Sequence, residues 1–224
     1  MIIPGLHIKA ALQFRAKEDA RYYLNGICFR SGVGHTVATD GHRLIVCERL
    51  PLRELNAYEQ DLALAMDTYR IPKELAPETW HGDEKNFPNE ELILDVPINF
   101  KVGEVVDVRA DGTMINYKRD KKLNRLVVEN VYKFKRHDGR YPNYEKLAFP
   151  ETPITERKPK GAPWLNAEYL AVFAKFSPKF AGPKIYIGDE GEPVYFRFTP
   201  PGKCPEKANA VYHAITALIM PMRD

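Results

Sequence analysis

Three pairs of β-prone segments, each joined by a short turn that contains an acidic residue and glycine, constrain this chain more than any other feature. The paired segments are residues 36–39 with 42–47, 105–109 with 113–117, and 184–187 with 194–198. Their turns contain Asp40-Gly41, Asp111-Gly112 and Asp189-Glu190-Gly191. Asp-Gly between two such segments is a strong hairpin signal, because both residues tolerate the positive φ angles of a type I′ turn. The sequence therefore predicts antiparallel sheets built from hairpins.

Each group of strands is accompanied by a candidate helix. Residues 8–17 place apolar and basic positions on opposite faces, which predicts roughly three turns with Lys9 and Lys17 on an exposed basic face. A second, short helix is expected at residues 73–80, where Pro77 limits its length. A third is expected after the N-cap residue Asn166, and its apolar stripe consists of Leu170, Phe173 and Phe176.

The order of helices and hairpins divides the chain into helix-plus-sheet modules, and the expected fold class is α+β. The modules lie near residues 1–50, 68–148 and 163–224. A chain of 224 residues is long enough for one large or two small domains. We expect a two-module domain at residues 1–149, a proline-bearing linker at residues 150–163 and a final module at residues 164–224. Polar insertions are expected near residues 53–67 and 81–100.

The net charge and the cysteine content restrict the partners and the cellular compartment that we expect for this protein. A net charge of +3 is too balanced to imply a nucleic-acid or membrane partner, so any basic surface must be local. Three cysteines without CxxC spacing fit a reducing compartment better than a disulfide framework. No signal peptide and no apolar run of about 18 residues is present. We therefore expect a cytoplasmic protein with no membrane partner.

Candidate catalytic and metal-binding residues have simpler explanations. Asp40 and His42 are close and titratable, but residues around a glycine turn usually serve the hairpin. A zinc set of Cys28, His35, His42 and Cys47 lacks the paired short spacing of tetrahedral sites, and both cysteines fit strand interiors. A nuclease would need clustered carboxylates, for which the candidates are Asp83, Glu84, Glu90 and Glu91 in an expected insertion. We predict no enzyme, no metal and no cofactor.

Two further segments have both an ordinary and a functional interpretation. The basic run Lys118, Arg119, Lys121, Lys122 and Arg125 continues with Lys133, Lys135 and Arg136. A solvated loop is its commoner meaning, and a surface that contacts phosphates is the alternative. The last residues, Met220-Pro221-Met222, fit a core strand on composition alone. Two methionines beside a proline also suit an adaptable apolar groove that accepts peptides.

Four separated motifs, in the same order, resemble the bacterial β sliding clamp, the processivity subunit of replicative DNA polymerase. They are Asp19-Ala20-Arg21-Tyr22-Tyr23-Leu24-Asn25-Gly26, Thr36-Val37-Ala38-Thr39-Asp40-Gly41-His42-Arg43-Leu44, Asp138-Gly139-Arg140-Tyr141-Pro142-Asn143-Tyr144 and Met220-Pro221-Met222-Arg223. The chain resembles a shortened, phage-like version that begins at the second domain of that family. The resemblance implies a DNA-clamp fold with helices that line a basic bore and sheets that form the outer wall.

The resemblance also implies an apolar cleft for short peptides from DNA polymerases and the clamp loader. The matching positions are Leu24, Thr39, Gly41, His42, Arg43, Leu44, Pro142, Lys146, Leu147, Leu218, Ile219, Met220, Pro221 and Met222. Gly41 permits the turn, and leucine and methionine side chains supply soft pocket walls. On this basis the terminal methionines are expected to border a groove.

Double-stranded DNA is the second implied partner, held by sequence-independent electrostatic contacts inside a ring. The candidate contacts are Lys9, Lys17, Lys73, Lys175 and Lys179. Because closed family rings contain twelve modules, three modules per chain imply a homo-oligomer of four copies, and a fourth module would imply a trimer. The alternative is a clamp-like adaptor or decoy that forms no ring but captures clamp-binding peptides and so modulates host replication.

Overall fold

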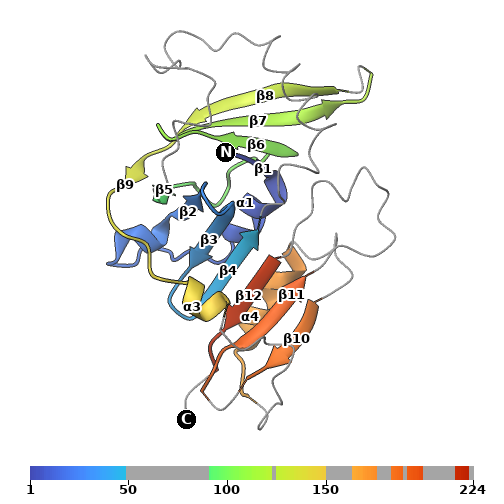
Figure 1. Ribbon diagram of the computed structural model, residues 1–224. Helices are drawn as coiled ribbons and strands as arrows, with labels where there is room; N and C mark the ends of the chain where they lie inside the picture. The colour runs from blue at the N-terminus through green and yellow to red at the C-terminus, as the bar shows by residue number, and fades with distance from the viewer. Residues whose placement is uncertain are drawn as a thin grey trace.

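Two antiparallel sheets organise the computed structural model, which describes residues 1–48, 91–122, 125–149, 163–175, 183–188, 191–198 and 215–221 (Figure 1). Within these residues the four-stranded sheet has the order β1 (Ile2–Pro4), β6 (Val105–Val108), β7 (Thr113–Asp120) and β8 (Arg125–Lys133). The eight-stranded sheet has the order β10 (Pro183–Ile187), β11 (Val194–Phe198), β12 (Ile215–Ile219), β4 (Arg43–Glu48), β3 (His35–Thr39), β2 (Ile27–Arg30), β5 (Glu91–Leu94) and β9 (Arg136–His137). The α+β class with hairpin-built antiparallel sheets is confirmed.

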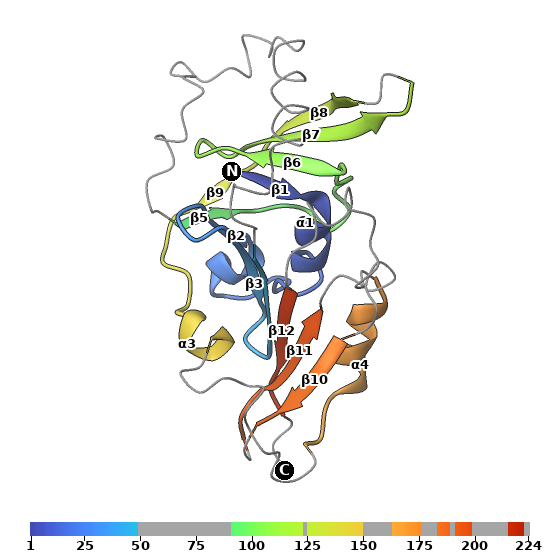
Figure 2. The same cartoon turned by 45° about the vertical axis from the view of Figure 1, so that its right-hand side comes forward.

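Helix α1 (Gly5–Ala11) lies between the two sheets, and it is shorter than its sequence predicts (Figure 2). Ile8 of α1 belongs to one core cluster together with Val106 of the four-stranded sheet and Ile45 of the eight-stranded sheet. A helix covered on both sides has little room for a basic face, and within α1 only Lys9 is exposed. The helix ends after about two turns, so Lys17 lies beyond it, in an exposed bend.

The predicted hairpins form, but their turn type differs from the prediction. Strands β3 and β4 are antiparallel and pair from Thr39 opposite Leu44, beside the turn, to His35 opposite Glu48. A type I′ turn needs positive φ at both central residues, yet Gly41 has φ of +90° and Asp40 does not. Instead, the Asp40 carboxylate accepts hydrogen bonds from the backbone N–H groups of His42 and Arg43, at 3.0 and 2.8 Å. The aspartate closes this turn through its side chain.

Strand β5 corrects the expectation of a polar insertion near residues 81–100. Its residues pair with β2 on one side and with β9 on the other. Leu92, Ile93 and Leu94 are each at most 3% exposed, so this segment is core. Glu91, a candidate carboxylate of the expected insertion, is the first residue of β5 and accepts a hydrogen bond from the backbone N–H of Tyr141 at 2.9 Å.

The C-terminal segments are joined to the N-terminal ones through the eight-stranded sheet, because β12 pairs with β4 along five residue pairs. Helix α4 (Ala167–Ala171) begins at Asn166, whose side chain accepts a hydrogen bond from Glu168 N–H as predicted. A 3-10 turn, η5 (Val172–Lys175), follows. The expected apolar stripe is only partly correct, since Phe173 is buried while Leu170 is 37% exposed.

A 3-10 turn, η1 (Tyr22–Asn25), precedes β2. Several predicted segments lie outside the described residues. The helix at residues 73–80, the insertion near 53–67 and nearly all of the linker at 150–163 lie outside the described residues. In the part of the chain that the structure describes, no helix has the length and apolar character needed to cross a membrane.

Candidate functional site

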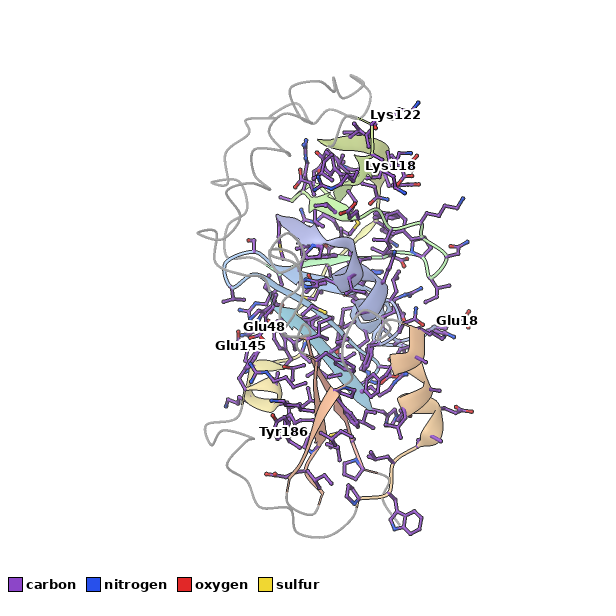
Figure 3. The ribbon with its side chains drawn as sticks, turned by 90° about the vertical axis from the view of Figure 1, so that its right-hand side faces the viewer. Glu18, Glu48, Lys118, Lys122, Glu145 and Tyr186 are labelled. Atoms are coloured by element: carbon purple, nitrogen blue, oxygen red, sulfur yellow. The ribbon has the colours of Figure 1, made fainter. Side chains whose placement is uncertain are left out.

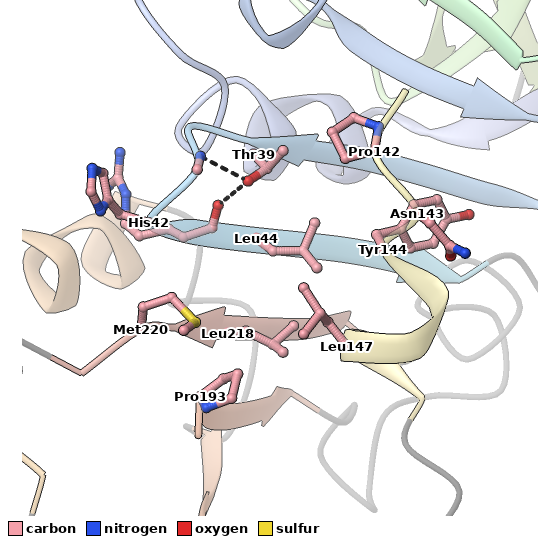
Figure 4. A pocket seen from close by; sticks show the side chains of 12 residues that line it. Thr39, His42, Leu44, Pro142, Asn143, Tyr144, Leu147, Pro193, Leu218 and Met220 are labelled. Atoms are coloured by element: carbon pink, nitrogen blue, oxygen red, sulfur yellow. Dashed lines mark hydrogen bonds between the residues drawn. The ribbon is translucent and has the colours of Figure 1, made fainter. Parts of the chain in front are cut away.

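One apolar pocket lies where three distant parts of the chain meet (Figure 4). The β3–β4 hairpin, the segment leading into helix α3 (Glu145–Ala148), and the facing ends of β11 and β12 form its walls. The lining residues are Thr39, Gly41, His42, Arg43, Leu44, Pro142, Asn143, Tyr144, Leu147, Pro193, Leu218 and Met220. The pocket is partly open to solvent, and its cavity volume is about 80 Å³.

Most residues that the sequence assigned to a cleft line this pocket, and the remainder have identifiable positions. Leu24 lies below the pocket floor, in the buried cluster that also contains Leu44 and Leu218. Ile219 is fully buried in the other core cluster, because successive side chains of a strand point to opposite faces. Lys146 is exposed, Pro221 is half-buried, and neither lines the pocket. Met222 lies outside the described residues.

Three lining residues were missed in the sequence analysis. Asn143 and Tyr144 belong to the motif at residues 138–144, so the motif itself could have indicated them. Pro193 follows the β10–β11 turn and enters the pocket because β11 pairs with β12 in the register that sets Val194 opposite Ile219. No local signal in the sequence distinguishes Pro193 from the other prolines of the chain.

The rim of the pocket is fixed by hydrogen bonds at the hairpin tip. The Thr39 hydroxyl donates to the carbonyl of Arg43 at 2.6 Å and accepts from the backbone N–H of Gly41 at 3.1 Å (Figure 4). Beyond β12, the backbone N–H of Met220 donates to the carbonyl of His42 at 2.9 Å. The hairpin and the C-terminal strand therefore form one continuous rim.

The Arg43 guanidinium anchors this rim to helix α4 and to the core. Its Nε and Nη2 atoms donate to one Asp40 carboxylate oxygen, at 2.9 and 2.6 Å. The same group lies 4.7 Å from the ring centroid of Tyr169 in α4 and 5.4 Å from that of Phe14. Such an enclosed, charge-paired guanidinium contributes through its planar surface as well as its charge. Arg43 is therefore chiefly a structural member of the pocket wall.

A network of polar side chains at the start of α3 supports the pocket wall that α3 forms. The Tyr144 hydroxyl lies 2.9 Å from His35 Nδ1 and 3.5 Å from an Arg30 guanidinium nitrogen, and Arg30 also forms an ion pair with Glu145. Burial, opposed by Arg30, raises the pKa of Tyr144 to about 12, so its hydroxyl stays protonated at neutral pH. On the far side, the Tyr195 hydroxyl donates to the Leu147 carbonyl at 3.1 Å.

The position of His35 in this network predicts a pH dependence of stability. Burial lowers the pKa of His35 below 6.5, an effect that Arg30 reinforces and Glu145 opposes. The unfolded chain then binds a proton more readily than the native chain, so this stabilising contribution is present above about pH 6.5 and is lost as the pH falls through the lower native pKa. In urea unfolding between pH 7 and 5, we expect His35→Gln to lose less stability than the wild type.

The wild type, measured in parallel over the same pH range, is the reference for this measurement. An unchanged pH dependence in His35→Gln would contradict the assignment of the effect to His35.

The predicted DNA-contacting lysines are not gathered in one described segment. Lys9 is exposed on α1, Lys17 is exposed after it, and Lys175 is exposed at the end of η5. Lys73 and Lys179 lie outside the described residues. The structure therefore leaves their role a prediction.

The candidate metal ligands do not gather into a site within the described residues. There, no group of three or more histidine, cysteine or acidic side chains could hold a metal ion. Cys28 in β2 and Cys47 in β4 are free and fully buried, where burial raises the pKa of both thiols. Asp83, Glu84 and Glu90 lie outside the described residues. An apolar pocket of this kind is suited to binding a ligand with apolar groups.

Comparisons with known proteins agree with the resemblance found in the sequence. The chain is 26% identical over 182 residues to the β sliding clamp of Escherichia coli K12, a match that covers 80% of this chain and 40% of that protein. The β sliding clamp of Salmonella typhimurium is 26% identical over 179 residues, or 78% of this chain and 38% of that protein. The chain thus spans about two-fifths of the length of these relatives. No protein-family profile matches it.

Solved structures give the same fold. The DNA polymerase sliding clamp of Bacillus subtilis aligns with a TM-score of 0.52 and 14% identity, over all of this chain and 64% of that one. That of Pseudomonas aeruginosa, solved with a ligand, aligns with a TM-score of 0.51 and 14% identity, over all of this chain and 65% of that one. The chain therefore has the DNA-clamp fold, and its sequence is similar to those of bacterial β sliding clamps.

Proposed function

We propose that this chain is a sliding-clamp processivity factor that encircles duplex DNA as a homo-oligomeric ring and binds partner peptides in the pocket. One observation carries the proposal: residues near Leu44, Pro142 and Met220, far apart in sequence, line a single apolar pocket on a clamp fold. The partners that the similarity suggests are DNA polymerases and the clamp loader.

The chemistry of the pocket favours an extended peptide with large apolar side chains. Leu44, Leu147 and Leu218 face the same space, with Met220 at the rim and Pro193 below it (Figure 4). Burial of one leucine or phenylalanine side chain stabilises a complex by about 1.5–3 kcal/mol. A flexible methionine allows the rim to adapt to peptides of different shape. Because burial dominates, the affinity should vary little with salt.

We expect the protein to hold DNA through noncovalent contacts, with no covalent bond made or broken. Contacts between exposed basic side chains and phosphates are independent of sequence and weaken as salt rises. Lys9, Lys17 and Lys175 are exposed and can take part, and Lys73 and Lys179 remain further candidates. The proposed protein is an accessory factor of a DNA polymerase and has no catalytic residue.

The mass of the native assembly tests the ring directly. If three modules per chain build a twelve-module ring, we expect a tetramer in multi-angle light scattering, and a trimer if each chain supplies a fourth module. The ring should also stay on circular duplex DNA and slide off after linearisation. A monomer at micromolar concentration that is also lost from circular DNA would contradict the proposal.

The alternative of a non-ring adaptor or decoy rests on a separate observation. This single chain supplies every described residue that lines the pocket, so peptide capture needs no second copy. A monomer that binds a clamp-binding peptide with micromolar affinity, and does not remain on circular DNA, would favour this alternative. An oligomer that passes the circular-DNA test would exclude it.

A further inference from the structure

The β7–β8 hairpin extends beyond the sheet to which it belongs. Strand β6 pairs with β7 only as far as Tyr117, whereas β7 and β8 continue to pair from Lys118 opposite Val127 to Asp120 opposite Arg125. A register shift between Asn116 and Tyr117 marks the point where this extension begins. We call the described residues 118–122 and 125–127 the ribbon, and they project at the end of the molecule opposite β10 (Figures 1 and 2).

The ribbon concentrates the positive charge of the chain. Residues 118–125 contain five lysines or arginines and one aspartate, an excess of four positive charges, whereas the whole chain carries a net charge of only +3. The side chains of Lys118, Arg119, Lys121 and Lys122 are all exposed. Figure 3 shows Lys118 and Lys122 at the tip of the molecule, far from Tyr186 in β10. A strong local potential at one end is the usual electrostatic signature of a polyanion-binding surface.

Two basic side chains of the ribbon form long ion pairs with carboxylates of the protein. Lys118 lies 3.5 Å from a Glu129 oxygen, and Arg119 lies 4.0 Å from a Glu104 oxygen. The Lys118 side chain is 57% exposed, and exposed ion pairs of this kind contribute little stability. The Asp120 carboxylate accepts a hydrogen bond from the backbone N–H of Lys122 at 2.8 Å and so shapes the turn. A phosphate can therefore replace Glu129 as the partner of Lys118 at low cost.

We propose that the ribbon binds the phosphate backbone of duplex DNA, as an additional contact to the expected helix lysines. This inference rests on the proposed function, which places the chain on DNA. Single-stranded nucleic acid is bound largely by aromatic stacking, and residues 118–125 contain no aromatic side chain. Lysine and arginine without stacking partners match the sequence-independent contacts of a duplex backbone. A two-stranded ribbon is also narrow enough to follow a groove.

A pair of charge-matched variants tests the ribbon. The ribbon variant combines Lys118→Gln, Arg119→Gln, Lys121→Gln and Lys122→Gln. The control variant removes the same number of charges elsewhere through Lys101→Gln, Arg140→Gln, Lys146→Gln and Lys184→Gln, all at exposed positions. Binding to a fluorescent 30-base-pair duplex is measured by anisotropy over a range of NaCl concentrations. Equal thermal unfolding of the three proteins establishes that they are folded.

The ribbon variant is expected to bind duplex DNA at least tenfold more weakly than the wild type at 100 mM NaCl. The magnitude of the slope of log affinity against log salt should fall by up to about 3.6, since each of four lost phosphate contacts contributes about 0.9. The control variant should lose less than about threefold and keep the slope. Equal losses in the two variants, or a preference of the wild type for single-stranded DNA, would overturn the ribbon proposal.

Retention on circular DNA separates this inference from the proposed function. If the wild type remains on circular DNA but the two variants bind the duplex equally, only the ribbon proposal fails. If the wild type is lost from circular DNA while the ribbon variant alone loses duplex affinity, the ring fails and the ribbon proposal stands.

Discussion

Replacement of Leu147 by aspartate is expected to weaken peptide binding by about 30- to 1000-fold, which corresponds to about 2–4 kcal/mol. Leu147 lines the pocket from α3 and is 48% exposed before a peptide binds. The substitution removes an apolar contact and leaves a carboxylate that a bound peptide would desolvate, and both changes oppose binding. A labelled peptide from the clamp-binding segment of a bacterial polymerase, titrated by anisotropy, measures the loss.

Val33→Asp is the matched control for this prediction. Val33 lies in the β2–β3 loop and is also 48% exposed, so the two substitutions place the same charge at equally exposed apolar positions. Of these two residues, only Leu147 lines the pocket. We expect wild-type peptide affinity for Val33→Asp, and similar stability for both variants. Equal affinity of Leu147→Asp and Val33→Asp would show that the peptide binds elsewhere, or not at all.

Replacement of Phe173 by alanine is expected to lower the free energy of unfolding by about 3–5 kcal/mol, as is typical for a buried aromatic side chain. Phe173 is 8% exposed. Its ring centroid lies 4.7 Å from that of Phe196, 5.2 Å from that of Phe198 and 6.1 Å from that of Phe14. The Phe173 side chain thus packs η5 against β11 and against the segment after α1. Urea unfolding measures the contribution of this side chain to the free energy of unfolding.

Leu170→Ala is the control for Phe173→Ala, because it removes an apolar side chain from the same short helical region. Leu170 is 37% exposed, so its loss should cost less than about 1 kcal/mol. Comparable destabilisation by the two substitutions would contradict the assignment of Phe173, rather than Leu170, as the core residue. The comparison also tests the correction to the predicted apolar stripe.

Local chemistry explains the predictions that succeeded. The hairpins at Gly41 and Gly112 and the N-cap at Asn166 depend on backbone φ angles and on hydrogen bonds between residues a few positions apart. The same local reasoning missed the turn type, because the Asp40 side chain, rather than a second positive φ angle, closes the β3–β4 hairpin. The sequence thus predicts the position of a hairpin better than it predicts the geometry of the turn.

Strand β5 was missed for a different reason. The strand follows a polar, proline-bearing stretch, and its three apolar residues, 92–94, are too short a run to distinguish a core strand from a loop. The strand exists because β2 and β9 supply hydrogen-bond partners on its two sides. The length of α1 was overestimated similarly, since contacts with both sheets, and not helical spacing, decide which residues it can bury.

The sequence by itself determined where the hairpins lie, which residue caps α4, and which four motifs resemble a sliding clamp, because these depend on short-range chemistry and residue order. Only the tertiary structure decided that Leu218 faces the pocket while Ile219 enters the core, and that Tyr144 and Pro193 complete the walls. Those outcomes depend on the register of β12 with β4 and with β11. The paired residues of β4 and β12 lie more than 160 positions apart in the sequence, so local chemistry cannot set their register.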